Sequence, residues 1–228
     1  MKIIKGKRKS LEVKAAQLIG EKIRQLAKDK EKIVFAVPGG NSIVSILKLL
    51  KTQKIPWHKV HLFMVDEVLL PLNHPKSNYG QAYSILLEYL TKQYKMPKEN
   101  LHPYDFFNFP PEQGTEAYKN ELREISHHFD LVLLSSGEDG HIGSLFPNYS
   151  IKDTSDSYIY IDNSPKLPKK RISASAKLLS KSHSSILLFF GGTKKQAYKN
   201  FLNKEFSVLD CPAKIVSNIE ESYVFTDI

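Results

Sequence analysis

Cysteine and long apolar runs are scarce in this sequence. Its 228 residues include one cysteine, Cys211, which excludes an internal disulfide bond and any zinc site built from several cysteines. No apolar run reaches the roughly 18–20 residues that a membrane-spanning helix needs, and a run such as 186–190 has the length of a strand. The basic segment 1–10 leads into no apolar stretch, so no secretory signal is expected. These absences predict a reducing, cytoplasmic location and no membrane partner.

Arginine is scarce as well. Only four of the 33 basic residues are arginines, although arginine is the side chain that binds phosphates and bases through paired hydrogen bonds. Residues 1–32 hold eleven basic and four acidic residues, a net +7, so the total of +9 leaves +2 for the rest of the chain. Apolar residues recur here at helical spacing behind Ser10, the predicted N-cap. We therefore expect a solvated surface helix and no nucleic-acid partner.

Apolar runs of strand length alternate with helical patterns along the chain. At 41% apolar and 25% charged residues, 228 residues suit one folded domain. The predicted strands are 32–37, 60–65, 129–134, 157–161, 171–175, 185–190 and 222–226, and the predicted helices are 43–50, one capped by Ser77, one starting near Pro111, and 193–202. Each of the first three strands is apolar at all but one position, which is typical of a mostly parallel sheet covered on both faces. The sequence therefore predicts an α/β fold of three layers.

Ligands of parallel sheets bind at the carboxyl ends of the strands, which here selects residues 38–42, 66–80 and 135–147. In the first segment, glycines let the backbone approach a ligand, and the following helix offers its free N–H groups to an anion. The alternative is a plain turn with Asn41 or Ser42 as an N-cap. The segment is not a P-loop, because no Gly-Lys-Ser/Thr follows.

Titratable side chains stand at the other two strand ends. Asp66 and Glu67 come directly after a strand, where one could act as a base or orient a histidine; a solvated pair is the alternative. His141 ends the turn Gly137-Glu138-Asp139-Gly140 after the third strand, and imidazole titrates close to neutral pH. We therefore predict a functional histidine, with a structural one as the alternative.

A basic segment with two prolines, Ser164–Arg171, contains four cations in eight residues. An exposed loop would explain it, but prolines reduce the entropy cost of fixing Lys166 and Arg171 on an anion such as phosphate. A Ser-His-Asp triad with Ser135, Ser136 or Ser144 is a weaker hypothesis, since the sequence has no Gly-x-Ser-x-Gly turn.

These segments together resemble the 6-phosphogluconolactonase family. Asp130-Leu-Val-Leu-Leu-Ser-Ser-Gly-Glu-Asp-Gly-His-Ile-Gly-Ser-Leu-Phe-Pro147 is similar to the family's histidine block. Asp66-Glu67 with Ser77-Asn78-Tyr79-Gly80, and Ser164-Pro-Lys with Arg171-Ile-Ser, are similar to two further blocks, while Gly39-Gly40 stands at the place of a glycine loop. The motifs follow the family's order over nearly the whole chain.

The resemblance implies a Rossmann-like sheet with a small extra subdomain, shared with glucosamine-6-phosphate deaminases, ribose-5-phosphate isomerases and CoA transferases, within a single domain spanning 1–228. It implies hydrolysis of 6-phospho-D-glucono-1,5-lactone in the pentose phosphate pathway by a monomer without metal or cofactor. His141 would be the general base, beside the carboxylates of Asp66, Glu67 and Asp139. Substrate-binding roles fall to Gly39, Gly40, Asn41, Ser42, Asn78, Gly137, Lys166 and Arg171, with Lys166 and Arg171 on the phosphate.

Two positions depart from the family pattern. Val68 replaces the arginine expected after Asp66-Glu67, and Asn41-Ser42-Ile43 replaces Ser-Thr-Pro in the glycine loop. Two alternatives therefore stay open. One is a deaminase or isomerase of the same fold, although the deaminases' block continues to Asn-Glu-Pro where this chain has Ser144-Leu-Phe-Pro147. The other is a sugar-phosphate-binding relative without activity.

Overall fold

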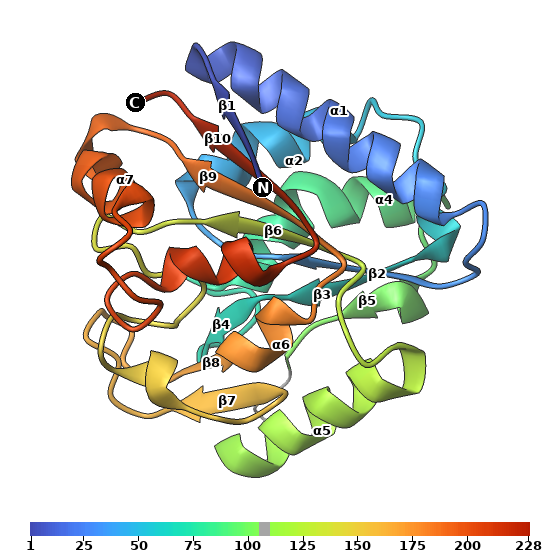
Figure 1. Cartoon of the computed structure of the whole chain (residues 1–228). Coiled ribbons are helices and arrows are strands. Elements are labelled where there is room, and N and C mark those ends of the chain that lie inside the picture. Colours follow the sequence, from blue (N-terminus) through green and yellow to red (C-terminus); the bar gives the residue numbers. More distant parts are fainter. Residues whose placement is uncertain (105–109) are drawn as a thin grey trace.

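A seven-stranded sheet forms the centre of the computed structural model, which describes residues 1–104 and 110–228 (Figure 1). Its order is β1-β10-β9-β6-β2-β3-β5, and every neighbouring pair is parallel. The strands are β1 (Lys2–Lys5), β2 (Ile33–Val37), β3 (Val60–Met64), β5 (Leu101–His102), β6 (Leu131–Ser135), β9 (Ser184–Phe189) and β10 (Glu221–Thr226). A second, antiparallel sheet has the order β4-β8-β7 and consists of β4 (Asp66–Val68), β8 (Arg171–Ala174) and β7 (Tyr158–Ile161).

Helices cover both faces of the large sheet. One layer consists of α1 (Arg8–Leu26), α2 (Val44–Leu50), α3 (Asn78–Ala82) and α4 (Glu88–Lys92), with a π-helical turn at Tyr83–Leu87 between the last two. The other consists of α5 (Pro111–Ile125), α6 (Ala176–Ser180) and α7 (Lys195–Leu202). Successive residues of β2 alternate between the two cores: Val34 and Ala36 pack toward the second layer, and Phe35 and Val37 toward the first. The predicted three-layer α/β fold is confirmed.

The apolar runs predicted most of these elements. The seven predicted strands are present with shifts of one or two residues at their ends, and Ser77 caps α3 by accepting a hydrogen bond from the Gly80 N–H. The sequence did not reveal β1, β4, β5 or α6, which are five residues long or shorter.

Ser10 is not the N-cap of the first helix, contrary to the prediction. Helix α1 begins at Arg8, and Lys7 stands at the N-cap position without a side-chain hydrogen bond. The preceding strand β1 ends at Lys5, and Arg8 Nε pairs with Glu12 one turn later, at 2.8 Å. The helix is therefore extended toward its N-terminus by an ion pair instead of a polar cap.

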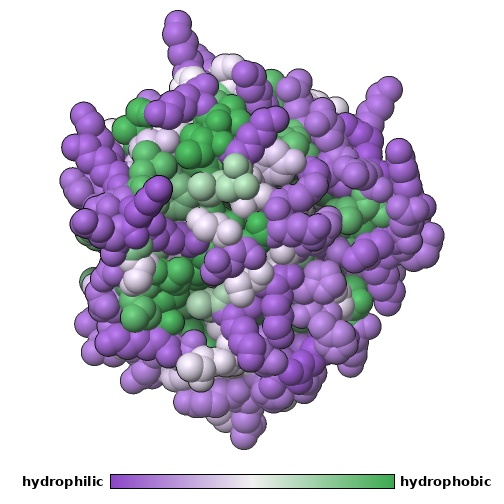
Figure 2. All heavy atoms as spheres, viewed as in Figure 1, coloured by the Kyte–Doolittle hydropathy of each residue, from purple (hydrophilic) through white to green (hydrophobic). Residues whose placement is uncertain are grey.

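The surface is mostly polar on the side shown in Figure 2, where hydrophobic residues form smaller areas between hydrophilic ones. Across the described ranges, 1–104 and 110–228, no helix combines the length and apolarity needed to cross a membrane. The short second sheet lies beside the carboxyl ends of the central strands. Directly after β3, the Val65 N–H donates to the Val37 carbonyl of β2, and the Ala174 N–H of β8 donates to the Val65 carbonyl. This junction brings the two sheets together around the candidate site.

Candidate active site

A cleft of about 410 Å³ opens at the carboxyl ends of β2 and β6, next to the second sheet. Residues 38–42, which follow β2, and residues 135–138, which include the last residue of β6, form its floor. The side chains that complete the cleft come from segments far apart in the sequence: Asp66, Asn78, His141, Lys166, Arg171 and Lys194. The placement agrees with the general position of ligands in parallel α/β sheets.

His141 is held in the cleft by the turn that follows β6. The Gly137 N–H donates to the His141 carbonyl at 2.8 Å, and the Gly140 N–H donates to the Gly137 carbonyl at 3.2 Å. The His141 Nδ1 is hydrogen-bonded to the Asp139 carboxylate, so Nε2 is the nitrogen left to act on a ligand. Burial opposes ionisation of Asp139, but the hydrogen bonds and charge of His141 and the charge of Lys166 outweigh it and keep the pKa of Asp139 below its usual value.

Close packing fixes the orientation of the imidazole ring. A Cβ atom on Gly137 would lie 1.9 Å from His141 Cε1, so only glycine fits against the ring at this position. Phe146 covers the ring with its centroid at 4.7 Å. Lys166 Nζ lies 3.5 Å from His141 Nδ1 and 3.7 Å from Asp139 Oδ2. A cation therefore stands beside the dyad of His141 and Asp139.

A second cation, Lys194, lies at the corner of the cleft formed by the glycine turn. Its Nζ donates to the Ser42 and Ser135 hydroxyls, both at 3.0 Å, and it forms no ion pair within the described part of the chain. Burial lowers the pKa of Lys194 to about 8. An ammonium group held without a carboxylate is suited to an anionic ligand. Gly40, with a φ of 99°, exposes the backbone of the turn beside it.

Asp66 and Arg171 form a third polar group in the cleft. The Ser144 hydroxyl donates to Asp66 Oδ2 at 2.7 Å, and Arg171 Nη1 is 3.9 Å from the same oxygen. Burial raises the pKa of Asp66, while Ser144 and Arg171 act in the opposite direction. Arg171 also donates from Nε and Nη2 to the carbonyls of Pro168 and Leu167, which fixes its guanidinium group at the edge of the cleft.

Glu67 does not line the cleft, although the sequence suggested a catalytic role for it. Its side chain is fully buried and accepts hydrogen bonds from the Val68, Asn78 and Tyr79 N–H groups and from the Ser77 hydroxyl. The next residue, Val68, is 3% exposed and pairs with Arg171 across β4 and β8. Val68 borders a side lobe of about 230 Å³ that shares Gly40, Asn78 and Arg171 with the cleft.

The model of the family "Glucosamine-6-phosphate isomerases/6-phosphogluconolactonase" matches residues 6–225. The chain belongs to this family. A 6-phosphogluconolactonase of Borreliella burgdorferi is 34% identical over 202 residues, which cover 88% of this chain and 86% of that protein.

Solved structures of similar proteins support the same assignment. The crystal structure of 6-phosphogluconolactonase from Thermotoga maritima has a TM-score of 0.88 at 26% identity and covers 100% of this chain and 99% of its own. A monomeric glucosamine-6-phosphate deaminase has a TM-score of 0.85 at 18% identity, covering 100% of this chain and 97% of its own. This second likeness shows the shared fold alone.

The structure brings most of the predicted site residues of this family member together. His141, Asp66 and all eight predicted substrate-binding residues line the cleft, and Asp139 lies directly behind His141. Lys194 is the residue that the sequence analysis missed. The available signal was the turn Gly191-Gly192-Thr193 after an apolar strand, which repeats the arrangement of Gly39-Gly40-Asn41 after β2. Among the described residues, no three His, Cys, Asp or Glu side chains are placed to hold a metal ion.

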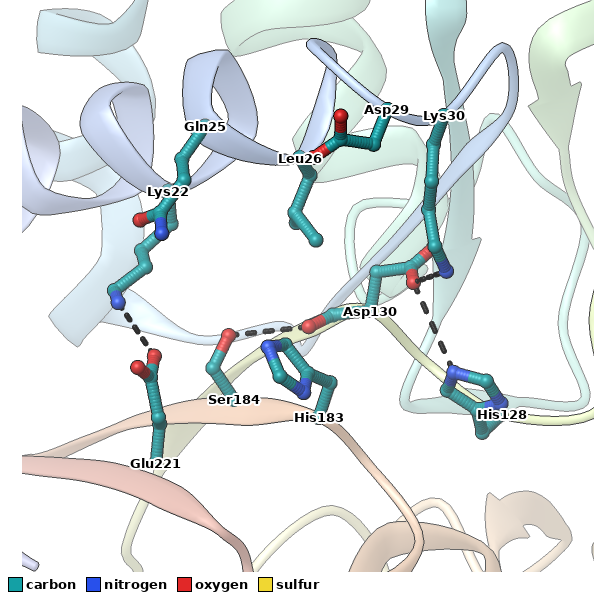
Figure 3. Close-up of a pocket in the computed structure, with 10 residues that line it drawn as sticks. All are labelled: Lys22, Gln25, Leu26, Asp29, Lys30, His128, Asp130, His183, Ser184 and Glu221. Carbon is teal, nitrogen blue, oxygen red and sulfur yellow. Dashed lines mark hydrogen bonds and ion pairs between the residues drawn. The ribbon is translucent and has the colours of Figure 1, made fainter.

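Another pocket, of about 330 Å³, lies at the opposite end of the sheet (Figure 3). It is bordered by the end of α1 and by the starts of β9 and β10. Its charged side chains are largely paired with one another: Lys22 with Glu221 at 2.5 Å, and Lys30 with Asp130, which is 1% exposed. Because these charges are already compensated, the pocket offers much less to a charged ligand than the cleft around Lys194 does.

Proposed function

We propose that this chain hydrolyses 6-phospho-D-glucono-1,5-lactone to 6-phosphogluconate, a reaction of the pentose phosphate pathway, with His141 as the general base. The observation that carries the mechanism is the dyad of His141 and Asp139 in the cleft, which leaves Nε2 able to accept a proton. The family and the named lactonases that resemble this chain support the choice of substrate.

In the proposed mechanism, His141 Nε2 takes a proton from water as the water oxygen adds to the lactone carbon C1. The bond between C1 and the ring oxygen then breaks, and the ring oxygen receives the proton from His141. A lactone is an activated ester, so a positioned base and stabilisation of the oxyanion suffice without a covalent intermediate. Asp139 stabilises the imidazolium, and we assign stabilisation of the oxyanion to Lys166, whose Nζ lies 3.5 Å from His141 Nδ1.

We place the substrate phosphate against the turn 39–42 and Lys194. Lys194 is supported for this role because its hydrogen-bond partners among residues 1–104 and 110–228 are hydroxyl groups, whereas Lys166 lies beside Asp139 and Arg171 beside Asp66. This assignment moves Lys166 and Arg171, the phosphate ligands expected from the sequence, toward the sugar and lactone end of the substrate. Asn41, Ser42 and Asn78 supply hydrogen-bonding groups between the two ends.

The test is turnover of freshly prepared 6-phosphogluconolactone in an assay coupled to a dehydrogenase that oxidises 6-phosphogluconate. The rate of spontaneous hydrolysis is subtracted at every substrate concentration. Acceleration in proportion to protein concentration would support the proposal. Binding of 6-phosphogluconate without turnover would instead identify a non-catalytic relative, and release of ammonia from glucosamine 6-phosphate would identify a deaminase.

We propose a monomer in the cytoplasm that binds no nucleic acid and requires no metal or cofactor. The concentration of basic residues in the first 32 positions, on and around the surface helix α1, supports the solvated role of these charges. Light scattering of the purified chain, and turnover measured before and after treatment with a chelator, would check two of these points.

A further inference from the structure

We propose that Glu67 is a positioning residue that sets the affinity of the turn 39–42 for phosphate, and that it acts through Asn78 and Gln81 without touching the substrate. The inference rests on the proposed function in one respect, namely that the turn 39–42 receives the phosphate. It assigns a task to a buried carboxylate that the catalytic mechanism leaves unused.

The two carboxylate oxygens of Glu67 accept four hydrogen bonds. Oε1 accepts from the N–H groups of Val68 and Asn78, both at 2.8 Å, and Oε2 accepts from the Tyr79 N–H at 2.7 Å and the Ser77 hydroxyl at 3.1 Å. Two of the N–H groups belong to the first turn of α3, which has no other acidic residue there. The carboxylate therefore fixes α3 on the end of β4.

Helix α3 packs against one side of the phosphate-binding turn, residues 39–42. The Asn78 side chain packs directly on Gly39, where a Cβ atom would lie 1.9 Å from Asn78 Oδ1. Asn78 Nδ2 also donates to the Asp66 carbonyl at 2.8 Å. One helical turn later, Gln81 Oε1 accepts from the Gly40 N–H at 2.8 Å. A displacement of α3 would therefore move Gly39 and Gly40 with it.

The chemistry at position 67 requires a carboxylate. A glutamine has one carbonyl oxygen, and its NH₂ group would face either the Tyr79 N–H or the N–H groups of Val68 and Asn78, so the Glu67→Gln variant leaves at least one buried backbone N–H without an acceptor. Aspartate keeps the charge, but its side chain is shorter by one methylene group and cannot reach all four donors in the same backbone geometry.

The inference separates binding from turnover. His141 is held by the turn 137–141, through hydrogen bonds that do not involve α3. Loss of the Glu67 carboxylate should therefore weaken phosphate binding and raise KM, while kcat changes little. A catalytic Glu67 would give the opposite result, a fall in kcat at nearly constant affinity.

The experiment compares wild type, Glu67→Gln, Asn78→Ala and the double variant by calorimetry with 6-phosphogluconate and with inorganic phosphate. Glu67→Gln should weaken the binding of both ligands by about thirtyfold, within the range of one charge-assisted hydrogen bond. Asn78→Ala should raise both dissociation constants by a similar factor. In the double variant, the dissociation constants should exceed those of either single variant by no more than about twofold, because both residues act in one chain of contacts. Glu88→Gln, which removes an exposed ion pair on α4, is the matched control and should leave affinity unchanged.

The pH dependence gives a second readout. Burial raises the pKa of Glu67 to about 7, against the effect of the backbone N–H groups. The groups that face Glu67 are Asp66 beside it, Arg171 on β8 and the phenol of Tyr118 on α5, while α3 presents only uncharged donors. A protonated Glu67 loses acceptor capacity, so the advantage of wild type over Glu67→Gln should shrink as the pH falls from about 8 to 6. Titration of the ligand affects both proteins and cancels in this ratio.

The proposal is overturned if Glu67→Gln lowers the melting temperature but leaves both dissociation constants unchanged, since Glu67 would then serve stability alone. If Glu67→Gln does not fold, Asn78→Ala decides: unchanged affinity overturns the inference, and weaker affinity supports it. Failure of the proposed function would look different, because wild type would then bind inorganic phosphate in a Glu67-dependent manner while showing no lactone turnover.

Discussion

His141 combines a fixed ring, a carboxylate partner and a free Nε2, so its replacement gives a direct test of the mechanism. The His141→Asn variant should lower kcat/KM for 6-phosphogluconolactone by roughly 10²–10⁴-fold, the usual contribution of general base catalysis. Affinity for 6-phosphogluconate, measured by calorimetry, should stay nearly constant because the phosphate is held elsewhere in the cleft. A corrected rate within about threefold of wild type would exclude His141 as the base.

Lys194 should control phosphate affinity rather than the rate of the chemical step. The Lys194→Ala variant should weaken 6-phosphogluconate binding by about 1.5–3 kcal/mol, the range of a charge-assisted hydrogen bond. Because the pKa of Lys194 is lowered to about 8, the free enzyme loses this charge as the pH rises through 8, and wild-type affinity should decline there. Calorimetry between pH 7 and 9 measures both effects, and Lys195→Ala, an exposed neighbour, is the control. Equal affinity of Lys194→Ala and Lys195→Ala would remove Lys194 from the site.

The sequence could predict where the residues of the cleft gather because the carboxyl ends of parallel strands meet at one edge of a sheet. It could not single out Lys194, one of 29 lysines, because only the fold brings it to Ser42 and Ser135. Nor could it separate the neighbours Asp66 and Glu67. Their side chains point to opposite sides of β4, so one lines the cleft and the other is buried behind it.

At the scale of elements, the short edge strand β5 is attached by a relay of buried polar groups. The His102 Nδ1 is hydrogen-bonded to Glu121 of α5 at 2.6 Å, and its Nε2 to His61 Nδ1 of β3 at 2.9 Å. His102 also stacks on Phe63, with ring centroids 4.1 Å apart. Burial lowers the pKa of His61 to about 4, and the charges of His102 and Lys32 add to the effect.

This relay predicts a loss of stability in acid. His61 binds a proton more weakly in the folded chain than in the unfolded chain. Its contribution to the free energy of unfolding is therefore complete above pH 6.5 and declines as the pH falls toward 4. After allowance for its partial solvation, we expect a loss on the order of 1 kcal/mol in the free energy of unfolding. Urea unfolding at pH 7 and pH 5 would measure it. The His61→Phe variant should lose less stability between these two pH values than wild type does, and an equal loss would contradict the assignment.

The sequence pattern predicts some strands more clearly than others. The runs that became β2, β6 and β9 are buried at nearly every position, so their apolar character alone marked them as central strands. Strand β1 has the sequence KIIK and β5 has only two residues, and both lie at edges of the sheet, where neither length nor burial leaves a clear pattern. Tertiary pairing, rather than local preference, decides such short strands.

At the scale of the whole molecule, Asp130 supports the fold at the end of the sheet opposite the cleft. Asp130, just before β6, accepts from the Val34 N–H at 2.8 Å and pairs with Lys30, while β6 ends at the floor of the cleft. Asp130→Ala should therefore destabilise the fold by about 2–4 kcal/mol, because a buried N–H and a cation lose their partner. The melting temperature should fall by about 5–15 °C. At 25 °C, kcat/KM should match wild type and the exposed control Asp29→Ala; a reduced kcat/KM in the folded variant would contradict this separation.

The single cysteine has a practical consequence for this arrangement. Cys211 is fully buried, and burial raises the pKa of its thiol to about 11, so it should react slowly with alkylating reagents. A cysteine introduced at Gln25, which is exposed near the end of α1 and borders the pocket of Figure 3, would then be the one thiol open to labelling. A dye or a tether attached there would sit at the far end of the sheet from the cleft, so the protein could be immobilised on a surface with its substrate entrance facing the solution.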